Sequence, residues 1–514
     1  MAEDTNRNLE ESTDSSETKR SYGMNLFGRL DIFTTADEIT EENVVSEVTS
    51  ALQFHFENVL AEEYLYWYRR GYQPVLNRKK ERNAFILNKV VTNIFDSFVT
   101  FANGYLLQEP AFYVSRKAGK KTKVDKLNEY LYRSGKQQAD NILADWFHMV
   151  GKAVLYCEPY DDPDIPLKAY ALDPKSAFVV YSLRPGKKPV FGVNVVIAGN
   201  KSLIDVYTNE KVFHLEGTAA SEKVTPFRIY DTAPTALVSV EPNRLHHIPL
   251  IEYRYNSVNM AKPEAALPLL DAISDVESNR VDGISQFIQS IAVAVNCQFD
   301  EGVTADTIKK AGFIALSSIG DNKADFKLLT SELNQDQTQT LVNDLYDKAL
   351  QICAVPSSVT NGRGTYDSTG AAAIFNNGWE QAAAAARNTE DLFKESNRYF
   401  DEILVDVLKR KGLLDIKLID FELNFLRSET AGIQSKAQAA QTMLTMGMHP
   451  ELAFKKSGLS NDPVSDVKLS EPYLRMVWGD PTAVKKAEEE NGGKGEAEIV
   501  EDDRIAEENS VGGV

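Results

Sequence analysis

Long apolar runs are missing from this chain of 514 residues. No stretch reaches the ~18 apolar residues that a membrane-spanning helix needs. No apolar segment follows a basic stretch at the N-terminus, because the first twenty residues are polar. We therefore expect neither a secretory signal nor a contact with a membrane.

Cysteine is scarce, and its pattern excludes a disulfide framework. The three cysteines, Cys157, Cys297 and Cys353, are far apart and odd in number, which is typical of reduced thiols. The six histidines are scattered and form no zinc-like pattern with the cysteines. His246 and His247 are adjacent, so their side chains diverge. The sequence predicts no metal site.

Catalytic motifs are also missing. The chain has no G-x-S-x-G elbow, P-loop, H-E-x-x-H or EF-hand pattern. Gly362-Arg363-Gly364 is glycine-rich, but it follows a predicted helix and lacks the Lys-Ser/Thr of a nucleotide loop. The acidic pairs Asp161-Asp162 and Asp502-Asp503 fall in a turn and in a polar tail. We expect no enzyme, no catalytic residue and no cofactor.

What the chain does have is apolar content and negative charge. Hydrophobic residues make up 43% of it, enough to bury sizeable cores. At roughly 100–200 residues per domain, the length of 514 residues suggests two to four structural units. The formal net charge is −19, so most of the surface repels DNA. This charge argues against a tight DNA-binding protein, but it is compatible with a surface past which DNA slides.

Apolar periodicity divides the chain into helical parts around a strand-rich part. Helices are predicted over residues 41–72, 83–104, 126–151, 263–291, 304–311, 334–353, 369–411, 434–446, 450–457 and 472–478. Short strands separated by turn signals are predicted over residues 153–158, 167–172, 177–181, 190–196, 203–208, 212–215, 227–230 and 248–255. Further strands are predicted over 292–299, 312–317, 326–329, 416–421 and 422–425. The strands between 153 and 255 predict an antiparallel unit.

A glycine-containing loop joins two of these helices. Pro356 ends the first helix, Asn361-Gly362 is a turn signal, and Asp367 or Ser368 can cap the second helix. Elsewhere, four aromatic residues within 64–68 precede Arg69 and Arg70. Such a cluster either stacks on bases or caps a core, and packing in a core is the favoured interpretation.

The order of these elements resembles the portal proteins of tailed bacteriophages, in particular the large portal family of Gram-positive siphophages. The resemblance covers roughly residues 45–478. Local stretches that resemble the family are Pro74–Lys80, Asn88–Pro110, His247–Tyr253, Ala265–Asn279, Ala354–Pro356, Ser368–Ala372 and Phe421–Arg427. The ordered series of elements, more than any one motif, carries the likeness.

The resemblance implies an α+β fold, mainly helical, with wing, stem, clip and crown parts, that assembles into a ring around an axial channel. The implied parts, listed in chain order, are an acidic disordered N-terminal arm (1–40), the wing (41–260), a stem helix (261–291), the clip (292–333), a second stem helix (334–356), a channel loop (357–367), a long wing helix with short strands (368–431), the crown (432–480) and an acidic disordered tail (481–514).

The implied function is that of a portal protein, a ring subunit at the unique capsid vertex. The ring, usually a dodecamer, forms the channel for packaging and ejection of double-stranded DNA. Implied partners are further copies of the chain, the major capsid protein, scaffold, the terminase large subunit and a head–tail connector or adaptor protein. The implied location is the virion, with assembly in the host cytoplasm. Another minor capsid or connector protein is the alternative, and a nucleic-acid-processing enzyme is disfavoured by the acidic charge and the missing motifs.

The resemblance also implies candidate site residues. The channel loop contains Asn361, Gly362, Arg363, Gly364, Thr365 and Tyr366. Asp271, Asp275 and Asp282 on the first stem helix are candidates for an acidic channel wall, along which few phosphates are held. Arg363 either touches phosphates transiently or is an exposed loop charge without a role.

Overall fold

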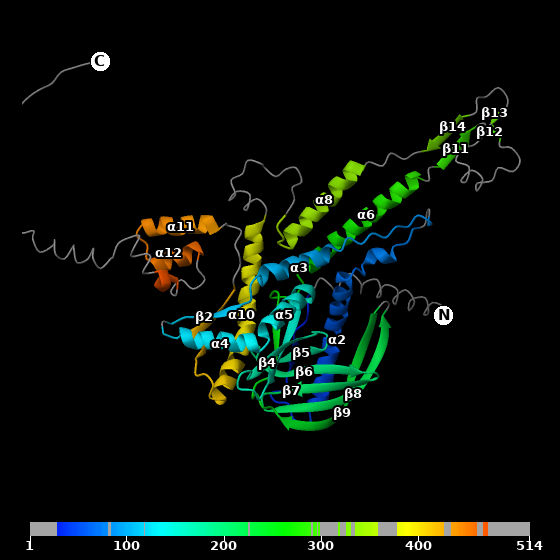
Figure 1. Ribbon diagram of the computed structural model, residues 1–514. Coiled ribbons are helices and arrows are strands. Elements are labelled where there is room, and N and C mark those ends of the chain that lie inside the picture. The colour runs from blue at the N-terminus through cyan, green and yellow to red at the C-terminus, as the bar shows by residue number, and fades with distance from the viewer. Residues whose placement is uncertain are drawn as a thin grey trace, which may run out of the picture. The chain divides into compact units, whose positions relative to one another are not determined.

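The computed structural model describes residues 28–80, 84–117, 119–224, 227–288, 291–295, 297–298, 317–318, 325–329, 335–357, 378–425, 433–459 and 466–470. The chain forms two compact units, Met1–Thr430 and Ala431–Val514. Figure 1 shows the elements of both. Among the described residues, no helix is both long enough and apolar enough to cross a bilayer.

Seven long helices of the first unit lie within the described ranges. They are α2 (Val44–Arg69), α3 (Ile94–Leu106), α4 (Lys121–Arg133), α5 (Lys136–Val150), α6 (Leu267–Ile288), α8 (Gln335–Ile352) and α10 (Trp379–Arg410). Short 3₁₀ turns are η2 (Pro74–Asn77), η3 (Glu264–Ala266) and η4 (Leu418–Asp420). The predicted 126–151 helix is two helices, because Gly135 takes a positive φ of 76° between α4 and α5.

The strand-rich part holds two sheets. The strands are β1 (Ile32–Thr34), β3 (Lys152–Pro159), β4 (Leu167–Leu172), β5 (Ala177–Ser182), β6 (Pro189–Ala198), β7 (Lys201–Tyr207), β8 (Lys211–Val224), β9 (Phe227–Pro242) and β10 (Leu250–Arg254). One sheet has the order β1-β5-β6-β7-β8-β9 and the other β10-β3-β4. All eight strands predicted between residues 153 and 255 are confirmed. Two of them, β8 and β9, continue past the predicted ends into one long hairpin.

The first 40 residues differ from the predicted arm, because residues 28–40 belong to the fold. β1 pairs in parallel with β5, and the backbone N–H of Arg29 donates to the carbonyl of Asn259. The Arg29 guanidinium also binds the Glu264 carboxylate in the interior. Buried backbone and charged groups need such partners, so this stretch is fixed rather than solvated.

The helix predicted over 83–104 is shorter, because α3 begins at Ile94. The described residues before it, 84–93, form no helix and run beside α6. Two of their backbone N–H groups donate to side chains of α6: Asn88 to the Asp282 carboxylate at 2.7 Å and Val90 to the Ser278 hydroxyl at 2.9 Å. Side chains of another helix therefore replace the local hydrogen bonds of a helix.

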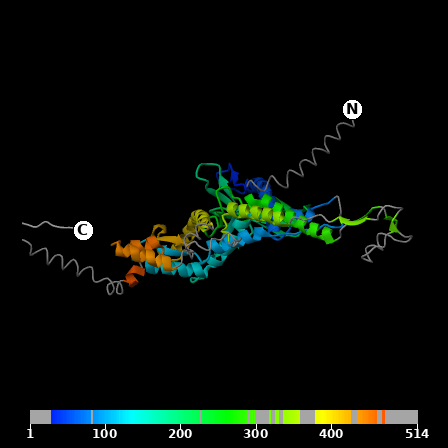
Figure 2. The same cartoon turned by 90° about the horizontal axis from the view of Figure 1, so that it is seen from above.

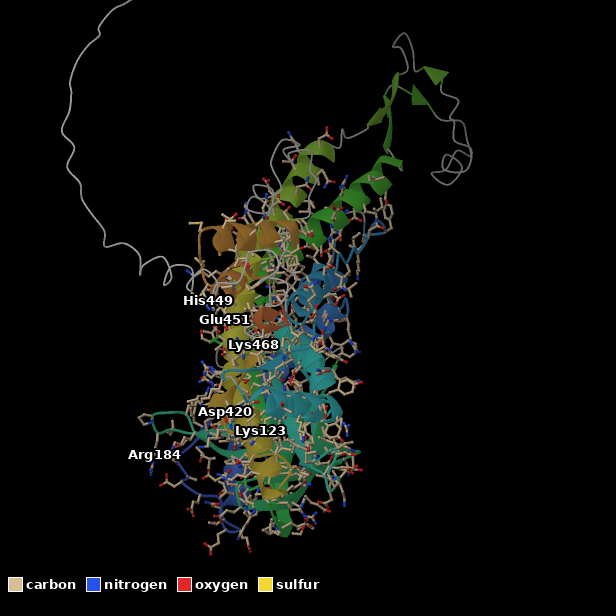
Figure 3. All side chains as sticks on the ribbon, turned by 60° about the vertical axis from the view of Figure 1, so that its left-hand side comes forward. Lys123, Arg184, Asp420, His449, Glu451 and Lys468 are labelled. Carbon is tan, nitrogen blue, oxygen red and sulfur yellow. The ribbon has the colours of Figure 1, made fainter. Side chains whose placement is uncertain are left out.

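The C-terminal part of the first unit also departs from prediction at one strand. Residues 416–420 contain η4 rather than a strand, whereas β15 (Phe421–Asn424) pairs antiparallel with β2 (Phe112–Ser115). The Asp420 carboxylate accepts a hydrogen bond from the Lys117 ammonium at 2.9 Å, and Figure 3 labels Asp420 together with Lys123 in this region. These contacts tie the end of α10 to the start of α4.

The core of the first unit is built from several apolar clusters. One joins α5, β3, β10 and α10 around fully buried Phe147, Tyr253, Phe393 and Phe400. A second joins α2, α3 and α5 to α6 and α8 through Tyr68, Phe98, Leu270 and Val342. The second cluster anchors the base of α6 and α8 on the rest of the unit.

Short strands lie between α6 and α8. β11 (Ile291–Val295) pairs antiparallel with β14 (Asp325–Leu329), and β12 (Cys297–Gln298) with β13 (Ser317–Ser318). The predicted strands at 292–299 and 326–329 are confirmed in this form. The predicted helix at 304–311 lies outside the described residues.

The second unit contains α11 (Ile433–Thr445) and α12 (Pro450–Ser457), as predicted. His449 caps α12, because its Nδ1 accepts a hydrogen bond from the N–H of Glu451 at 3.3 Å; both residues are labelled in Figure 3. The helix predicted over 472–478 lies outside the described residues.

Candidate functional site

The candidate site is the antiparallel pair of helices α6 and α8. Leu270 and Ile273 of α6 share a buried cluster with Val342 and Leu350 of α8. Farther from the base, the Arg280 guanidinium donates to the Gln339 side-chain oxygen at 2.7 Å. Apolar packing at the base and a polar contact toward the far end hold the two helices together.

A second segment lies against α6, and we call it the strap (residues 74–80 and 84–93). The Thr92 hydroxyl lies 3.2 Å from the Ser274 hydroxyl, and Val90 donates to Ser278. The Asn88 side chain also reaches the Ser285 hydroxyl at 3.4 Å. Figure 1 shows α6 between α8 and the blue segment that precedes α3, and Figure 2 shows the same order from above.

Asp282, one of the three predicted wall carboxylates, is the centre of this contact. Its Oδ1 accepts from both the backbone N–H of Asn88 at 2.7 Å and the Asn88 amide at 2.9 Å. Its Oδ2 lies 3.2 Å from Arg78 and 3.3 Å from Lys80. Burial alone would raise the pKa of this carboxyl, but the bonds from Asn88 and Lys80 outweigh burial and hold its pKa below the usual value. Asp282 is 2% exposed, and its charge is offset within its own chain.

Asp271 is partly buried and accepts a hydrogen bond from the Tyr68 hydroxyl at 2.8 Å. Burial raises the pKa of Asp271 to about 6; the Tyr68 bond lowers it and the charge of Asp275 raises it further. This carboxyl therefore changes charge near neutral pH and also links α2 to α6.

Asp275 differs from both, because its side chain is exposed. It lies one helical turn beyond Asp271, and Asn279, a further turn along, is exposed as well. The three predicted wall residues are thus not equivalent. Asp275 is the one among them that presents a solvated negative charge.

The predicted channel loop, including Asn361, Gly362, Arg363, Gly364, Thr365 and Tyr366, lies outside the described residues. The described residues before and after the gap 358–377 lie close together. A Cβ on Gly378 would lie 3.8 Å from the Cα of Pro356. The Gln381 amide donates to the carbonyl of Gln351 at 3.2 Å. The end of α8 therefore lies next to the start of α10.

The aromatic cluster next to Arg69 and Arg70 packs within the chain. The Tyr66 ring stacks on Trp146 with centroids 5.9 Å apart, and the Arg70 guanidinium lies 4.1 Å from the Tyr66 ring. Tyr68 is fully buried. Packing in a core, the favoured interpretation of this cluster, is confirmed.

Sequence reasoning missed a buried joint at the base of α6. Arg29 and Glu264 form it together with the turn at Asn259, whose amide donates to the carbonyl of Arg29 at 2.9 Å. Gly28 and Gly151 both press against this turn, since a Cβ on either would lie within about 2 Å of a carbonyl oxygen, 1.9 Å at Gly28 and 2.0 Å at Gly151. No local pattern reveals contacts between residues more than a hundred positions apart.

Within the ranges that the structure describes, no group of three or more His, Cys, Asp or Glu side chains is arranged to hold a metal ion. The recognisable features of the described residues are instead the helical pair α6–α8 and the strap, which is hydrogen-bonded along α6. The architecture is a mixture of helices and strands.

The family model described as "Phage portal protein, SPP1 Gp6-like" matches residues 59–493. The match spans α6, α8, the loop and the parts on either side, and it defines the class as structural proteins of phage particles. The chain belongs to the SPP1 Gp6-like family of phage portal proteins. It is a portal protein, a component of the DNA channel at a capsid vertex. Proteins of this family are structural rather than enzymatic.

Among solved structures, a chain of the "Neck of empty GTA particle computed with C6 symmetry" is similar at 11% identity and a TM-score of 0.40, over 71% of this chain and 90% of that chain. No curated protein matches the chain in sequence at the significance required.

Proposed function

We propose that copies of this chain assemble into a ring, a dodecamer, in which α6 and α8 form the stem around the DNA channel. The single observation that carries this proposal is the packed α6–α8 pair, with the end of α8 next to the start of α10. A helical pair repeated around an axis makes a continuous wall, and a loop at its end narrows the opening. The family of the chain supports this assignment.

The same proposal assigns the other parts. The wing is 41–260 with 368–431, the stem 261–291 and 334–356, the clip 292–333 and the crown 432–480. The small two-stranded pairings β11–β14 and β12–β13 between the stem helices support a separate clip. The separate compact unit from Ala431 onward supports a separate crown.

The channel wall is proposed to be acidic, so that phosphates are repelled and DNA slides. Asp275 is the leading residue because its carboxylate is exposed on α6. Asp271 contributes a charge only above about pH 6. Asp282 is proposed to position the strap, since its charge is already offset by Arg78 and Lys80.

The loop 357–367 is proposed as the channel constriction, with Asn361, Gly362 and Arg363 at its tip. Arg363 is its basic residue and is proposed to touch phosphates transiently. Substituting Arg363→Glu tests this role: we expect less DNA packaged per particle, with rings that still form. Unchanged packaging would leave the loop a spacer between subunits.

Proposed partners are the major capsid protein, scaffold, the terminase large subunit, a head–tail connector and double-stranded DNA. Deleting the insert 292–333 tests these partners: the chain should then lose docking of its neck and terminase partners, and retained docking would contradict this part of the proposal.

A further inference from the structure

We propose that the strap of each copy docks on the outer face of α8 of the next copy, with Phe85 and Leu341 as the apolar centre and Lys79 and Asp344 as an ionic pair beside them. This inference rests on the proposed ring. It adds which two surfaces meet, which the family match does not state.

The strap and α8 lie on opposite sides of α6. The side chains of α6 that bind the strap are Ser274, Ser278 and Asp282. Those that face α8 are Ile273, Val276 and Arg280. At about 100° per residue, the centres of these two faces are roughly 200° apart around the helix. Each copy is therefore layered as strap, α6 and α8, as Figures 1 and 2 show.

The outward surface of the strap is basic around one large apolar side chain. Phe85 is 76% exposed, so nearly all of its apolar ring is available to a partner. Charged residues in the described strap are Arg78, Lys79, Lys80 and Lys89, all of them basic. Asp282 offsets Arg78 and Lys80, and the Lys89 ammonium donates to the carbonyl of Leu76, whereas Lys79 is an exposed strap lysine with no offsetting carboxylate among these contacts. The surface thus calls for an apolar and acidic partner.

The outward surface of α8 has the complementary character. Val342 and Ala349 face the core, while Leu341, about 100° around the helix from Val342, is 48% exposed. Asp344 is exposed one turn from Leu341. α8 contains three aspartates and one lysine, a net charge of −2. The α8 surface is therefore apolar and acidic where the strap is apolar and basic.

Two different, complementary surfaces on opposite sides of one chain are what a closed ring requires. In a head-to-tail contact, the strap of one copy meets α8 of the next copy. Such contacts form a closed ring when the rotation between neighbouring copies adds up to a full turn. Opposite charges at the edge of such a contact set its register and discourage pairing of like surfaces. A second copy is therefore the occupant that fits both faces at once.

Crosslinking tests the pairing directly. The Phe85→Cys/Leu341→Cys chain is treated with a bis-maleimide shorter than the helix diameter of about 10 Å. Within one copy α6 separates the two positions, so a crosslink reports neighbouring copies. We expect a ladder of covalent multimers up to the full ring. Each single variant, and the Phe85→Cys/Tyr132→Cys pair with its exposed α4 position, should give no ladder.

Exchanging the charges of Lys79 and Asp344 provides a second test. Lys79→Glu and Asp344→Lys should each raise the concentration for half-maximal ring assembly about tenfold, and the double variant should return toward the native value. Lys201→Glu, at an exposed lysine of β7, is the matched control and should change nothing. Each variant is checked for native helix content by circular dichroism.

The outcomes separate this inference from the ring itself. Rings that form normally, with no 85–341 ladder and no rescue in the double charge variant, overturn the docking and leave the portal function intact. The docking is also overturned if Lys79→Glu leaves assembly unchanged but weakens binding of a DNA duplex, since the strap then faces DNA. Native chain that forms no ring at all contradicts the proposed function instead.

Discussion

Arg29 and Glu264, which are 235 positions apart in the chain, form an ion pair at 2.5 Å with both side chains fully buried. The pair joins the N-terminal segment before β1 to η3, the turn that leads into α6. The Arg29 guanidinium also donates to the carbonyl of Val150 at 3.1 Å, and the Glu264 carboxylate accepts from the N–H of Ala261 at 2.7 Å. The base of the proposed stem is thus held by the first described residues of the chain.

Removing one partner of this pair should leave the other charge buried and unpaired. We expect Arg29→Met to lower the free energy of unfolding by about 3–5 kcal/mol, measured by urea denaturation. Glu264→Gln alone should also be costly, because Arg29 then lacks a counter-charge. The double variant Arg29→Met/Glu264→Gln should cost clearly less than the sum of the two. Strict additivity would show that the pair makes no coupled contribution.

The Asp282 carboxylate should matter for stability more than its exposed neighbour Asp275. Asp282→Ala removes the hydrogen bonds to Asn88 and the contacts to Arg78 and Lys80, and should cost about 2–3 kcal/mol. Asp275→Ala should stay within about 0.5 kcal/mol, because this side chain is exposed. Hydrogen exchange supplies the structural readout: the amides of Asn88 and Val90 should lose protection in the Asp282 variant only. Equal protection in both variants would contradict the strap contact.

Two glycines test the close packing of the turn at Asn259. Gly151 has φ 96°, and a Cβ there would lie 2.0 Å from the Asn259 oxygen. Gly199 also has a positive φ, 71°, but nothing lies within 4 Å of its Cβ position. Gly199→Ala should cost only the backbone penalty of about 1–2 kcal/mol, whereas Gly151→Ala should cost more than about 3 kcal/mol. Similar thermal shifts for both would show that the turn moves aside.

A pH dependence should come from Asp401 of α10. This carboxyl accepts hydrogen bonds from the Tyr113 hydroxyl and from Asn397 at 3.0 Å. Burial raises the pKa of Asp401 to about 7, opposed by the Tyr113 bond and by the charge of Lys136. The unfolded chain ionises this group near its ordinary value of 3.8, so the folded state alone holds the proton between the two values.

The sign follows from that difference. The contribution of Asp401 to stability is fully present below about pH 4 and is lost as the pH rises toward about 7. Asn does not titrate, so the Asp401→Asn variant should lose about 3–4 kcal/mol less than the native chain over this range. Chemical denaturation at a series of pH values measures it. Parallel curves for the two proteins would show that Asp401 is ionised in the folded state.

Local patterns in the sequence predicted most of the elements but few of the long-range contacts. The alternation of apolar and polar residues between 153 and 255 gave all eight strands, because each side of a sheet repeats every second residue. Ile86 and Val90 also fit a helical spacing, yet they belong to the strap, since positions four apart share a side in a strand as well as in a helix.

The site was predicted only in part for a similar reason. The aspartates of α6 were recognised as acidic residues between apolar ones, but the spacing does not tell which of them is paired. Arg78 and Lys80 lie about two hundred positions before Asp282, and no helical or strand period connects such partners. Asp275 therefore remains the wall candidate because the fold leaves its side chain exposed. The residues next to it in the sequence do not reveal this exposure.

Electron microscopy of the purified full-length chain, at increasing concentration and with scaffold present, tests the central claim most directly. The account predicts symmetric rings with an axial hole, with the α6–α8 hairpins arranged around that hole and Asp275 facing it. A chain that stays monomeric at every concentration, or rings whose α6–α8 hairpins lie on the outer rim away from the hole, would contradict it.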